Sequence, residues 1–306
     1  MLQTQSAPPL PPTGASRVWL VAMPGLFVLL WSTGFIGAKL GLPYAEPMTF
    51  LALRFGAALA ILLPLMLLLR APWPESWRHA GHIAVAGLLI HGIYLGGIYG
   101  GLQFGVEAGT SALVVALQPL LVALFAGWFL GEHTTRLQWF GVALGVAGVA
   151  LVVGRKLSLD LGTPVGVGLQ LVALLGIAVG VLYQKRFCAN MNLLSGSVVQ
   201  LAAAAILVGV LALIFESGKI AWTGEFIFAL IWLVIVLSIG AFMLFYTLIK
   251  SGAAARVSSL LFLVPPSTAL IAWPLFGETL GVPSIIGMAL AVAGVALINW
   301  RAAQPA

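Results

Sequence analysis

The sequence predicts an all-α integral membrane protein in which ten transmembrane helices form two inverted five-helix repeats around a central cavity. Three observations support this prediction: the composition, ten apolar runs of membrane-spanning length, and an internal repeat at a constant offset. The chain has 306 residues, of which 61% are hydrophobic and only 7% are charged. A typical soluble domain is roughly 25% charged, so this chain has too few charges to cover a water-exposed surface. The lipid bilayer is therefore its expected environment.

The charges and the cysteine count exclude several other classes of protein. Fourteen Lys and Arg against eight Asp and Glu give a net charge of +6, but the bases stand singly between apolar runs. Nucleic-acid binding needs basic residues clustered on a solvated face, so no nucleic-acid partner is expected. The lone cysteine, Cys188, excludes an internal disulfide framework and a Cys-rich metal site. The single aspartate, Asp160, excludes Asp-rich magnesium motifs, and no metal or cofactor is expected.

The apolar runs define the expected spans, because a bilayer core about 30 Å thick requires about 20 apolar residues per helix. Ten such runs cover residues 18–40, 47–69, 81–104, 108–130, 136–154, 163–185, 194–215, 225–249, 254–276 and 283–300. Residues 1–16 carry four prolines and no hydrophobic pattern, which predicts a disordered cytoplasmic tail. Arg17 is the first base of the chain and no small-residue cleavage site follows, so the first run is expected to remain as an anchor.

The placement of Lys and Arg predicts the orientation, because cytoplasmic loops carry an excess of these residues. With the N-terminus inside, nine bases lie on the cytoplasmic side: Arg17, Arg70, Arg78, Arg136, Lys185, Arg186, Lys250, Arg256 and Arg301. Four lie outside, namely Lys39, Arg155, Lys156 and Lys219, and Arg54 falls within the second span. Both termini are therefore predicted to be cytoplasmic.

The sequence also repeats itself at an offset of 146 positions. Gly131-Glu132 aligns with Gly277-Glu278, Pro119 with Pro265, and Lys39 with Lys185. The run VAGVAL at 146–151 recurs unchanged at 292–297. Proline, Gly-Glu and lysine matches at one common offset are not expected from apolar low complexity alone. They predict a first repeat over residues 17–156 and a second over residues 163–301.

Five helices per repeat is an odd number, so the two halves must insert in opposite orientations. Inverted repeats are an architecture of secondary transporters, with the substrate near the midplane between the halves. The fifth and tenth helices carry small residues at close-packing spacing, namely Gly141, Gly145, Gly148, Gly287, Ala291 and Gly294. These two helices are predicted to pack together, away from the substrate route.

These features give the chain a resemblance to a known family. Its five-plus-five repeat and its paired Gly-Glu turns resemble the drug/metabolite transporter superfamily. The Leu53-Arg54-Phe55 sequence in the second helix and the prolines of the fourth and ninth helices are similar to the EamA-type branch, over residues 18–301. Within that branch the chain resembles bacterial inner-membrane exporters of aromatic amino acids. The resemblance implies a secondary transporter, not an enzyme, that exports aromatic and other neutral amino acids by alternating access. A broader efflux carrier for drugs, quaternary cations or nucleosides is the alternative.

Polar and aromatic residues inside the spans are the candidates for substrate binding, because polar groups in a bilayer usually face the bundle interior or a cavity. His91, Tyr94 and Tyr99 share roughly one face of the third helix. Gln118 precedes Pro119, whose ring leaves backbone carbonyls free nearby. The predicted substrate-binding residues are Trp31, Phe35, His91, Tyr94, Tyr99, Gln118 and Tyr246.

Each of these assignments has a structural alternative. Aromatic residues of membrane proteins often pack or anchor at the interface, and a glutamine can bond a neighbouring helix. Arg54 fits a structural clamp as well as it fits a contact to a substrate carboxylate. Glu132 and Glu278 follow glycines in tight turns, where capping of the following helix is the simpler interpretation. No carboxylate lies near the centre of a span, so facilitated flux and coupling through His91 both stay open.

Two other function classes compete with transport. An intramembrane enzyme needs a nucleophile with its base, or a metal cluster, within the bilayer, whereas His79 and His82 lie at the membrane edge without a carboxylate partner. A structural or receptor-like subunit does not need an inverted repeat. The expected partners are a small-molecule substrate and the bilayer, and a monomer is expected, with a dimer as the alternative.

Overall fold

The computed structural model describes residues 14–118, 121–122, 125, 136–158, 163–241, 244, 263–278 and 281–299. Within these ranges the regular structure is helical, apart from one isolated bridge between Ala45 and Ile220. Five described helical stretches are long and apolar enough to cross a membrane: Pro47–Leu68, Trp77–Gln103, Pro164–Phe187, Leu193–Phe215 and Gly224–Ala241. The prediction of an all-α integral membrane protein is confirmed.

The helices follow the order that the apolar runs predict. The first half contains α1 (Gly14–Gly41), α2 (Pro47–Leu68), the continuous stretch of α3 (Trp77–Gly87), η1 (Leu88–Ile93) and α4 (Tyr94–Gln103), then α5 (Ala108–Val115) and α7 (Arg136–Ser158). The second half contains α8 (Pro164–Phe187), α9 (Leu193–Phe215), α10 (Gly224–Ile231) continuing into η2 (Trp232–Ala241), α13 (Val264–Phe276) and α14 (Val282–Asn299). The runs predicted at 108–130, 225–249 and 254–276 are described only in part.

The helical part of the chain begins within the range of the predicted tail. Residues 1–13 lie outside the described residues, but α1 already begins at Gly14. The last proline before it is Pro12, so no proline interrupts the first turns of α1. The disordered cytoplasmic tail over residues 1–16 stays a prediction.

Local sequence signals fix where the second-half helices begin. Pro164 lies in the first turn of α8, where its missing N–H has no helical partner to lose. Thr163 caps the same helix, since its Oγ1 accepts a hydrogen bond from Gly166 N at 3.1 Å. Asn192 caps α9 by accepting from the backbone N–H groups of Leu194 and Ser195. These caps give backbone N–H groups in the first turns of α8 and α9 a hydrogen-bond partner.

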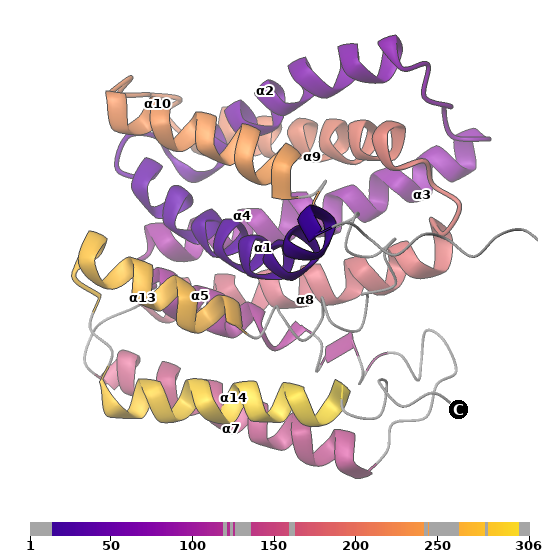
Figure 1. Ribbon diagram of the computed structural model, residues 1–306. Helices are drawn as coiled ribbons and strands as arrows, with labels where there is room; N and C mark the ends of the chain where they lie inside the picture. Colours follow the sequence, from indigo (N-terminus) through magenta and orange to yellow (C-terminus); the bar gives the residue numbers. More distant parts are fainter. Residues whose placement is uncertain are drawn as a thin grey trace, which may run out of the picture.

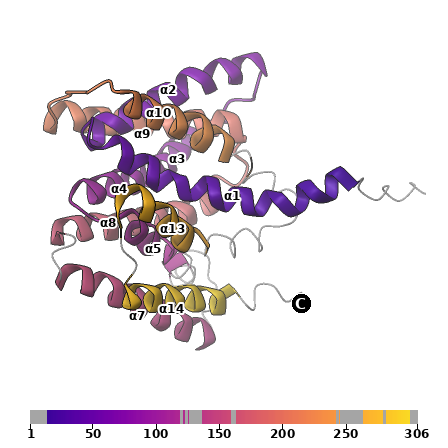
Figure 2. The same cartoon turned by 60° about the vertical axis from the view of Figure 1, so that its left-hand side comes forward.

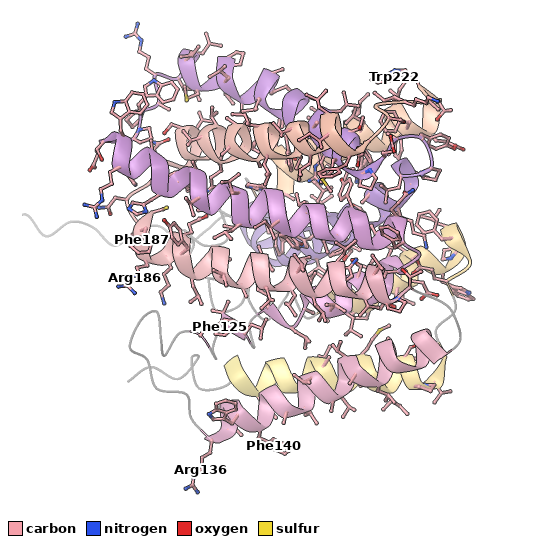
Figure 3. The ribbon with its side chains drawn as sticks, turned by 180° about the vertical axis from the view of Figure 1, so that it is seen from behind. Phe125, Arg136, Phe140, Arg186, Phe187 and Trp222 are labelled. Carbon is pink, nitrogen blue, oxygen red and sulfur yellow. The ribbon has the colours of Figure 1, made fainter. Side chains whose placement is uncertain are left out.

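The pair α7–α14 shows the two-fold relation between the halves. A Cβ on Gly148 would lie 2.5 Å from the carbonyl oxygen of Gly287, and a Cβ on Gly294 would lie 2.5 Å from that of Gly141. Adding 146 to 148 and 141 gives 294 and 287, so the two contacts are equivalent under the repeat. Figures 1 and 3 both show the two helices side by side at one edge of the molecule. The prediction that they pack together is confirmed.

The helices around the centre obey the same relation. α2 packs against its equivalent in the second half, α9. α4, from the third span of the first half, packs against α8, the first span of the second half. In the same way, α10 and η2 of the second half pack against α1 of the first half. In Figures 1 and 2 the layer of α2, α9 and α10 lies on one side of α1, while α13 and α5 separate α1 from the α7–α14 pair. The two halves therefore interleave rather than standing side by side.

Each half contains a π-helical segment at an equivalent position. η1 covers Leu88–Ile93, and adding 146 gives residues 234–239, which lie inside η2. A π segment widens the turn and is frequent at functional sites. In η2 the wider turn lets Ser238 Oγ donate to the carbonyl oxygen of Leu233, five residues back, at 3.1 Å. The third span of each half therefore carries a π-helical segment at an equivalent position.

Candidate functional site

A cavity of about 480 Å³ lies between the two halves. Small-molecule sites commonly measure about 300–1,000 Å³, so this space suits a metabolite. Its walls come from α1, α2, η1 and α4 of the first half and from α8, α9 and η2 of the second, with Gln118 following α5. None of the described residues of α7 or α14 lines it, which agrees with the prediction that this pair lies away from the substrate route.

Six of the seven predicted substrate-binding residues line this one cavity. They are Trp31, Phe35, His91, Tyr94, Tyr99 and Gln118. The seventh, Tyr246, lies outside the described residues. The structure thus brings together side chains from the first, third and fourth spans, as the sequence predicts. Their role in binding stays a prediction.

Aromatic rings form much of the first-half wall. Trp31 is half-buried and its ring packs against Phe27 with centroids 5.3 Å apart. Phe35 is buried one turn further along α1. Tyr99 is only 1% exposed and meets Phe50 edge to face, with centroids 5.3 Å apart. Such a wall offers ring faces and edges on which a planar apolar group can stack.

His91 lies in η1 and connects the first half to the second. Its ring is buried and contacts Phe55 edge to face, at 6.1 Å between centroids. Gln200 of α9 is a hydrogen-bond partner of His91. The amide nitrogen of Gln200 also donates to Gln184 Oε1 of α8 at 3.0 Å. A polar chain of one imidazole and two amides therefore crosses the space between the halves.

Arg54 is the residue of the cavity whose role the sequence left open. It lies in α2 and is 7% exposed, with Nη1 donating to the Tyr99 hydroxyl at 3.1 Å and Nε donating to Ser238 Oγ at 3.4 Å. Ser238 is itself fixed by its bond to Leu233. Arg54 therefore ties α2 to α4 and η2, as a clamp does, while its guanidinium also lines the cavity.

The charges of the lining are all positive. Arg54 and Lys185 line the cavity, and no Asp or Glu is among its described lining residues. The ion pair found in the described part of the chain, Lys39–Glu278, does not involve Arg54. The described lining therefore favours a ligand that carries at least one negative group.

The two walls occupy equivalent positions but carry different side chains. At an offset of 146, Arg54 corresponds to Gln200, His91 to Leu237, and Phe35 to Val181, and all six line the cavity. At these three pairs the first half supplies a guanidinium, an imidazole and a phenyl ring, and the second half supplies an amide and two aliphatic side chains. The helices around the cavity are related by the repeat, but the side chains that line it are not.

The predicted set of site residues missed several polar members of the lining. Arg54, Gln184, Gln200 and Ser238 were absent from it, although all four line the cavity. One signal was available in the sequence, because Arg54 and Gln200 are polar, lie within apolar spans and are equivalent under the repeat. Not every aromatic residue of the spans belongs to the site, since Trp273 is 60% exposed on α13 and is not among the lining residues.

Contacts between the two halves hold together the end of the bundle where α1 finishes, named here the Lys39 end. Lys39 Nζ donates to Glu278 Oε1 at 2.6 Å. The same carboxylate accepts from Ala108 N at 2.8 Å and from Gly109 N at 3.2 Å. Glu278 therefore caps α5 of the opposite half. The interpretation that it caps the following helix is wrong, because the tight turn at Gly277, with φ +67°, is followed by a side chain that is 6% exposed and bonded across the interface.

A second carboxylate joins the halves at this end. Glu216, the residue that follows α9, accepts from the backbone N–H groups of Met48 and Thr49, each at 2.7 Å. Negative charge at a helix N-terminus is favourable because of the partial positive charge there. The described acids with such contacts thus hold helix ends and do not enter the cavity.

Comparisons with known proteins agree with this architecture. The EamA-like transporter family matches residues 19–154 and again residues 164–300. The chain is 28% identical over 272 residues to the uncharacterized inner membrane transporter YedA of Escherichia coli, covering 89% of this chain and 87% of that one. It is 24% identical over 281 residues to a Salmonella typhimurium protein named "probable amino-acid metabolite efflux pump", covering 88% of this chain and 91% of the other.

A solved crystal structure shares the fold. It superposes with a TM-score of 0.64 at 21% identity, covering 94% of this chain and 99% of that chain. The family match takes in both halves, each of which supplies one wall of the cavity. The chain is thus a membrane transporter, and it belongs to the EamA-like transporter family.

Proposed function

We propose that this transporter exports small zwitterionic metabolites, chiefly aromatic and other neutral amino acids, across the inner membrane by alternating access. The observation that carries the proposal is the composition of the cavity: an aromatic first wall, two cations and amide groups, with no described carboxylate. The name of the Salmonella relative, an amino-acid metabolite efflux pump, supports the same substrate class.

The physical argument concerns the two charges of an amino acid. Burying a charge without a partner costs several kcal/mol, so a zwitterion requires partners for both of its groups. Cationic groups can meet the carboxylate, while the oxygens of Gln118 and of the Gln184–Gln200 pair can accept from the ammonium. An aromatic side chain then gains about 0.5–1.5 kcal/mol per well-placed ring contact beyond its burial.

The alternative, export of quaternary cations or nucleosides, fits the cavity less well. A permanent cation would face the Arg54 guanidinium, and no described lining residue offers it a carboxylate. A nucleoside could stack on the rings, but it carries no negative group to pair with the Arg54 guanidinium. The amino acid satisfies both features at once.

Counterflow in proteoliposomes tests the proposal directly. Vesicles loaded with unlabelled phenylalanine or tryptophan are expected to accumulate the labelled amino acid above the level of protein-free vesicles. Loading with uridine or tetraphenylphosphonium should give little counterflow of its own label. The proposal is contradicted if the cation or the nucleoside exchanges and the amino acids do not.

The proposed orientation, with both termini in the cytoplasm, rests on the count of nine bases against four. A reporter that is active only in the periplasm, fused after Ala306, is expected to be silent. The same reporter placed in the loop after Lys39, at Pro43, should be active. The reverse pattern would invert the assignment of the Lys39 end to the outer side.

A further inference from the structure

We infer that the Arg54 guanidinium, with the Tyr99 hydroxyl beside it, binds the carboxylate of the transported substrate. This inference rests on the proposed function and names the group that recognises one end of the zwitterion. It starts from a buried positive charge that lines the cavity and has no carboxylate within 4.0 Å among the described residues.

The hydrogen bonds of Arg54 hold it without using all of its donors. A guanidinium has five N–H groups in a planar fork. The described bonds use Nε, toward Ser238, and Nη1, toward Tyr99, and none of the described bonds involves Nη2. Tyr99 accepts in its bond, so its own O–H proton remains available to donate. A carboxylate entering here meets a positioned fork and a phenol from the same side of the cavity.

The geometry explains how the fork is kept in position. Ser238 lies in η2, and its donation to Leu233 directs its lone pairs toward Nε. Tyr99 is fixed by its edge contact with Phe50. Residues of both halves thus hold the Arg54 guanidinium in place. A fixed donor that can form two parallel hydrogen bonds is well suited to binding a carboxylate.

The repeat argues against a purely architectural arginine. The equivalent position in α9 is Gln200, which also lines the cavity and packs within the same pair of helices, α2 and α9. The frame therefore accepts a neutral amide at this position of the helix. A buried cation is costly in a membrane protein and usually serves a substrate or ion, so the charge at residue 54 requires a ligand that the amide at residue 200 does not.

The test compares ligands that differ in one group. Binding to the purified transporter is measured for phenylalanine, phenylalanine amide, phenethylamine and 3-phenylpropionate. The wild type is expected to bind phenylalanine about tenfold to a hundredfold more tightly than its amide, the range of a charge-assisted hydrogen bond. Arg54→Gln should abolish this preference, and Arg54→Lys should retain part of it, because a lysine keeps the charge and loses the fork.

Arg70→Gln is the matched control, since it removes the same side chain from an exposed position two residues after the end of the same helix. It should leave the preference unchanged. The preference is a ratio within one variant, so a general loss of stability in Arg54→Gln does not alter it. If that variant yields no folded protein, Arg54→Lys alone decides, because an unchanged preference there would overturn the inference.

The outcomes separate this inference from the proposed function. One outcome is that phenylalanine and phenylalanine amide bind equally well, both to the wild type and to Arg54→Gln. That result would overturn the role of Arg54 and leave amino-acid export standing. Binding of 3-phenylpropionate but not phenylalanine, abolished by Arg54→Gln, would support the anion site and contradict amino-acid export. Binding of none of the carboxylates would overturn both.

A separate observation, the ion pair at the Lys39 end, carries a second inference. We propose that Lys39 and Glu278 form a lock that keeps the cavity closed at this end and must break for it to open there. The carboxylate joins three parts of the chain: α1 through Lys39, α5 through Ala108 and Gly109, and the turn after α13, which carries Glu278 itself. Separating α1 and α5 from α13 requires these bonds to break together.

The lock is shielded from water, which strengthens it. The Glu278 side chain is 5% exposed and the Lys39 side chain 27%. Lys39 also lies over the Phe276 ring, at 5.0 Å from its centroid. The offset of 146 places Lys185 and Glu132 at the equivalent sequence positions, so the lock residues belong to the pattern that both halves share. Glu132 lies outside the described residues.

Thiol labelling tests the lock without any substrate. In a Cys188→Ser background, a cysteine replacing Ile98, a cavity residue that is 2% exposed, is labelled with a membrane-impermeant maleimide from the Lys39 side. Lys39→Met is expected to speed this labelling about fivefold, the lower end of typical coupling between states. Glu278→Gln should act in the same direction, and Lys219→Met, which removes a lysine from the same end, should not.

Equal labelling rates in Lys39→Met and in the parent would overturn the lock. A faster rate from both sides of the membrane together would also overturn it, because that result reports general unfolding. A faster rate from the Lys39 side with a slower rate from the other side is the result that supports it.

Discussion

The α7–α14 pair and the cavity are both built by the same two-fold relation, yet they use it in opposite ways. In the pair, the closest contacts use the same residue in both halves: Gly148 and Gly294 lie against the carbonyl oxygens of Gly287 and Gly141. In the cavity, equivalent positions carry different residues, such as Arg54 and Gln200. Equivalent positions thus carry the same residue where the helices touch and different residues where they line the cavity.

The physical reason lies in what each region must satisfy. Two backbones in van der Waals contact leave no room for a side chain, so both halves need a small residue at the contact. A cavity has no such restriction, and a zwitterion presents different groups to its two sides. The comparison teaches that the repeat is retained where packing requires it and lost where the substrate is asymmetric.

The largest expected effect comes from filling the α7–α14 contact. Gly148→Leu places a side chain where the Gly287 carbonyl oxygen already lies and should cost about 3 kcal/mol or more of stability. Gly209→Leu is the control, because a Cβ there meets nothing within 4 Å. Melting temperature and monodispersity in detergent should fall for the first and not for the second. A stable Gly148→Leu with altered substrate preference would place this pair at the substrate route.

Removing the imidazole of His91 should have the next largest effect. His91→Ala deletes the first-half end of the chain through Gln200 and Gln184. Export of phenylalanine from loaded vesicles is expected to fall at least tenfold, about 1.4 kcal/mol, with little change in melting temperature. Normal export by His91→Ala would remove the imidazole from the binding role.

A smaller loss is expected from the hydroxyl of Tyr99. Tyr99→Ala is a poor test, because this side chain is 1% exposed and its loss would cost about 3–5 kcal/mol of stability. Tyr99→Phe keeps the ring contact with Phe50 and removes only the bond to Arg54. Apparent affinity for amino acids should fall about fivefold, within the 0.5–1.5 kcal/mol of a single hydrogen bond. An affinity equal to that of the wild type would mean that the phenol only packs.

The smallest effects on substrate binding are expected from substitutions at Phe35 and Val181, which occupy equivalent positions in the two walls of the cavity. Phe35→Val gives the first wall the residue that the second carries at Val181. It should weaken binding of tryptophan about threefold, in the lower part of the range of one aromatic contact, and weaken binding of alanine less. Val181→Ala should change both by less than about threefold. A larger effect at Val181 would assign recognition of the aromatic ring to the second half.

Much of the fold and part of the site could be predicted from the sequence. The spans follow from run length, and the pairing of Gly148 with the tenth helix follows from the repeat. His91, Tyr94 and Tyr99 could be placed on one face because helical periodicity fixes which side chains lie together. Arg54 could be located but not interpreted, since its partners Tyr99 and Ser238 lie on two other helices. The polar second wall was missed because its amides stand singly in apolar runs.

The sequence by itself determined the membrane class, the two five-helix halves and the small-residue contact between α7 and α14, because each depends on local composition or on a constant offset. Only the tertiary structure decided that Glu278 caps α5, that Lys39 pairs with it, and that Arg54 reaches Ser238. Lys39 and Glu278 are 239 positions apart, and Arg54 and Ser238 are 184 apart. Such contacts depend on how the helices of two interleaved halves meet, and periodicity within one helix carries no information about its neighbours.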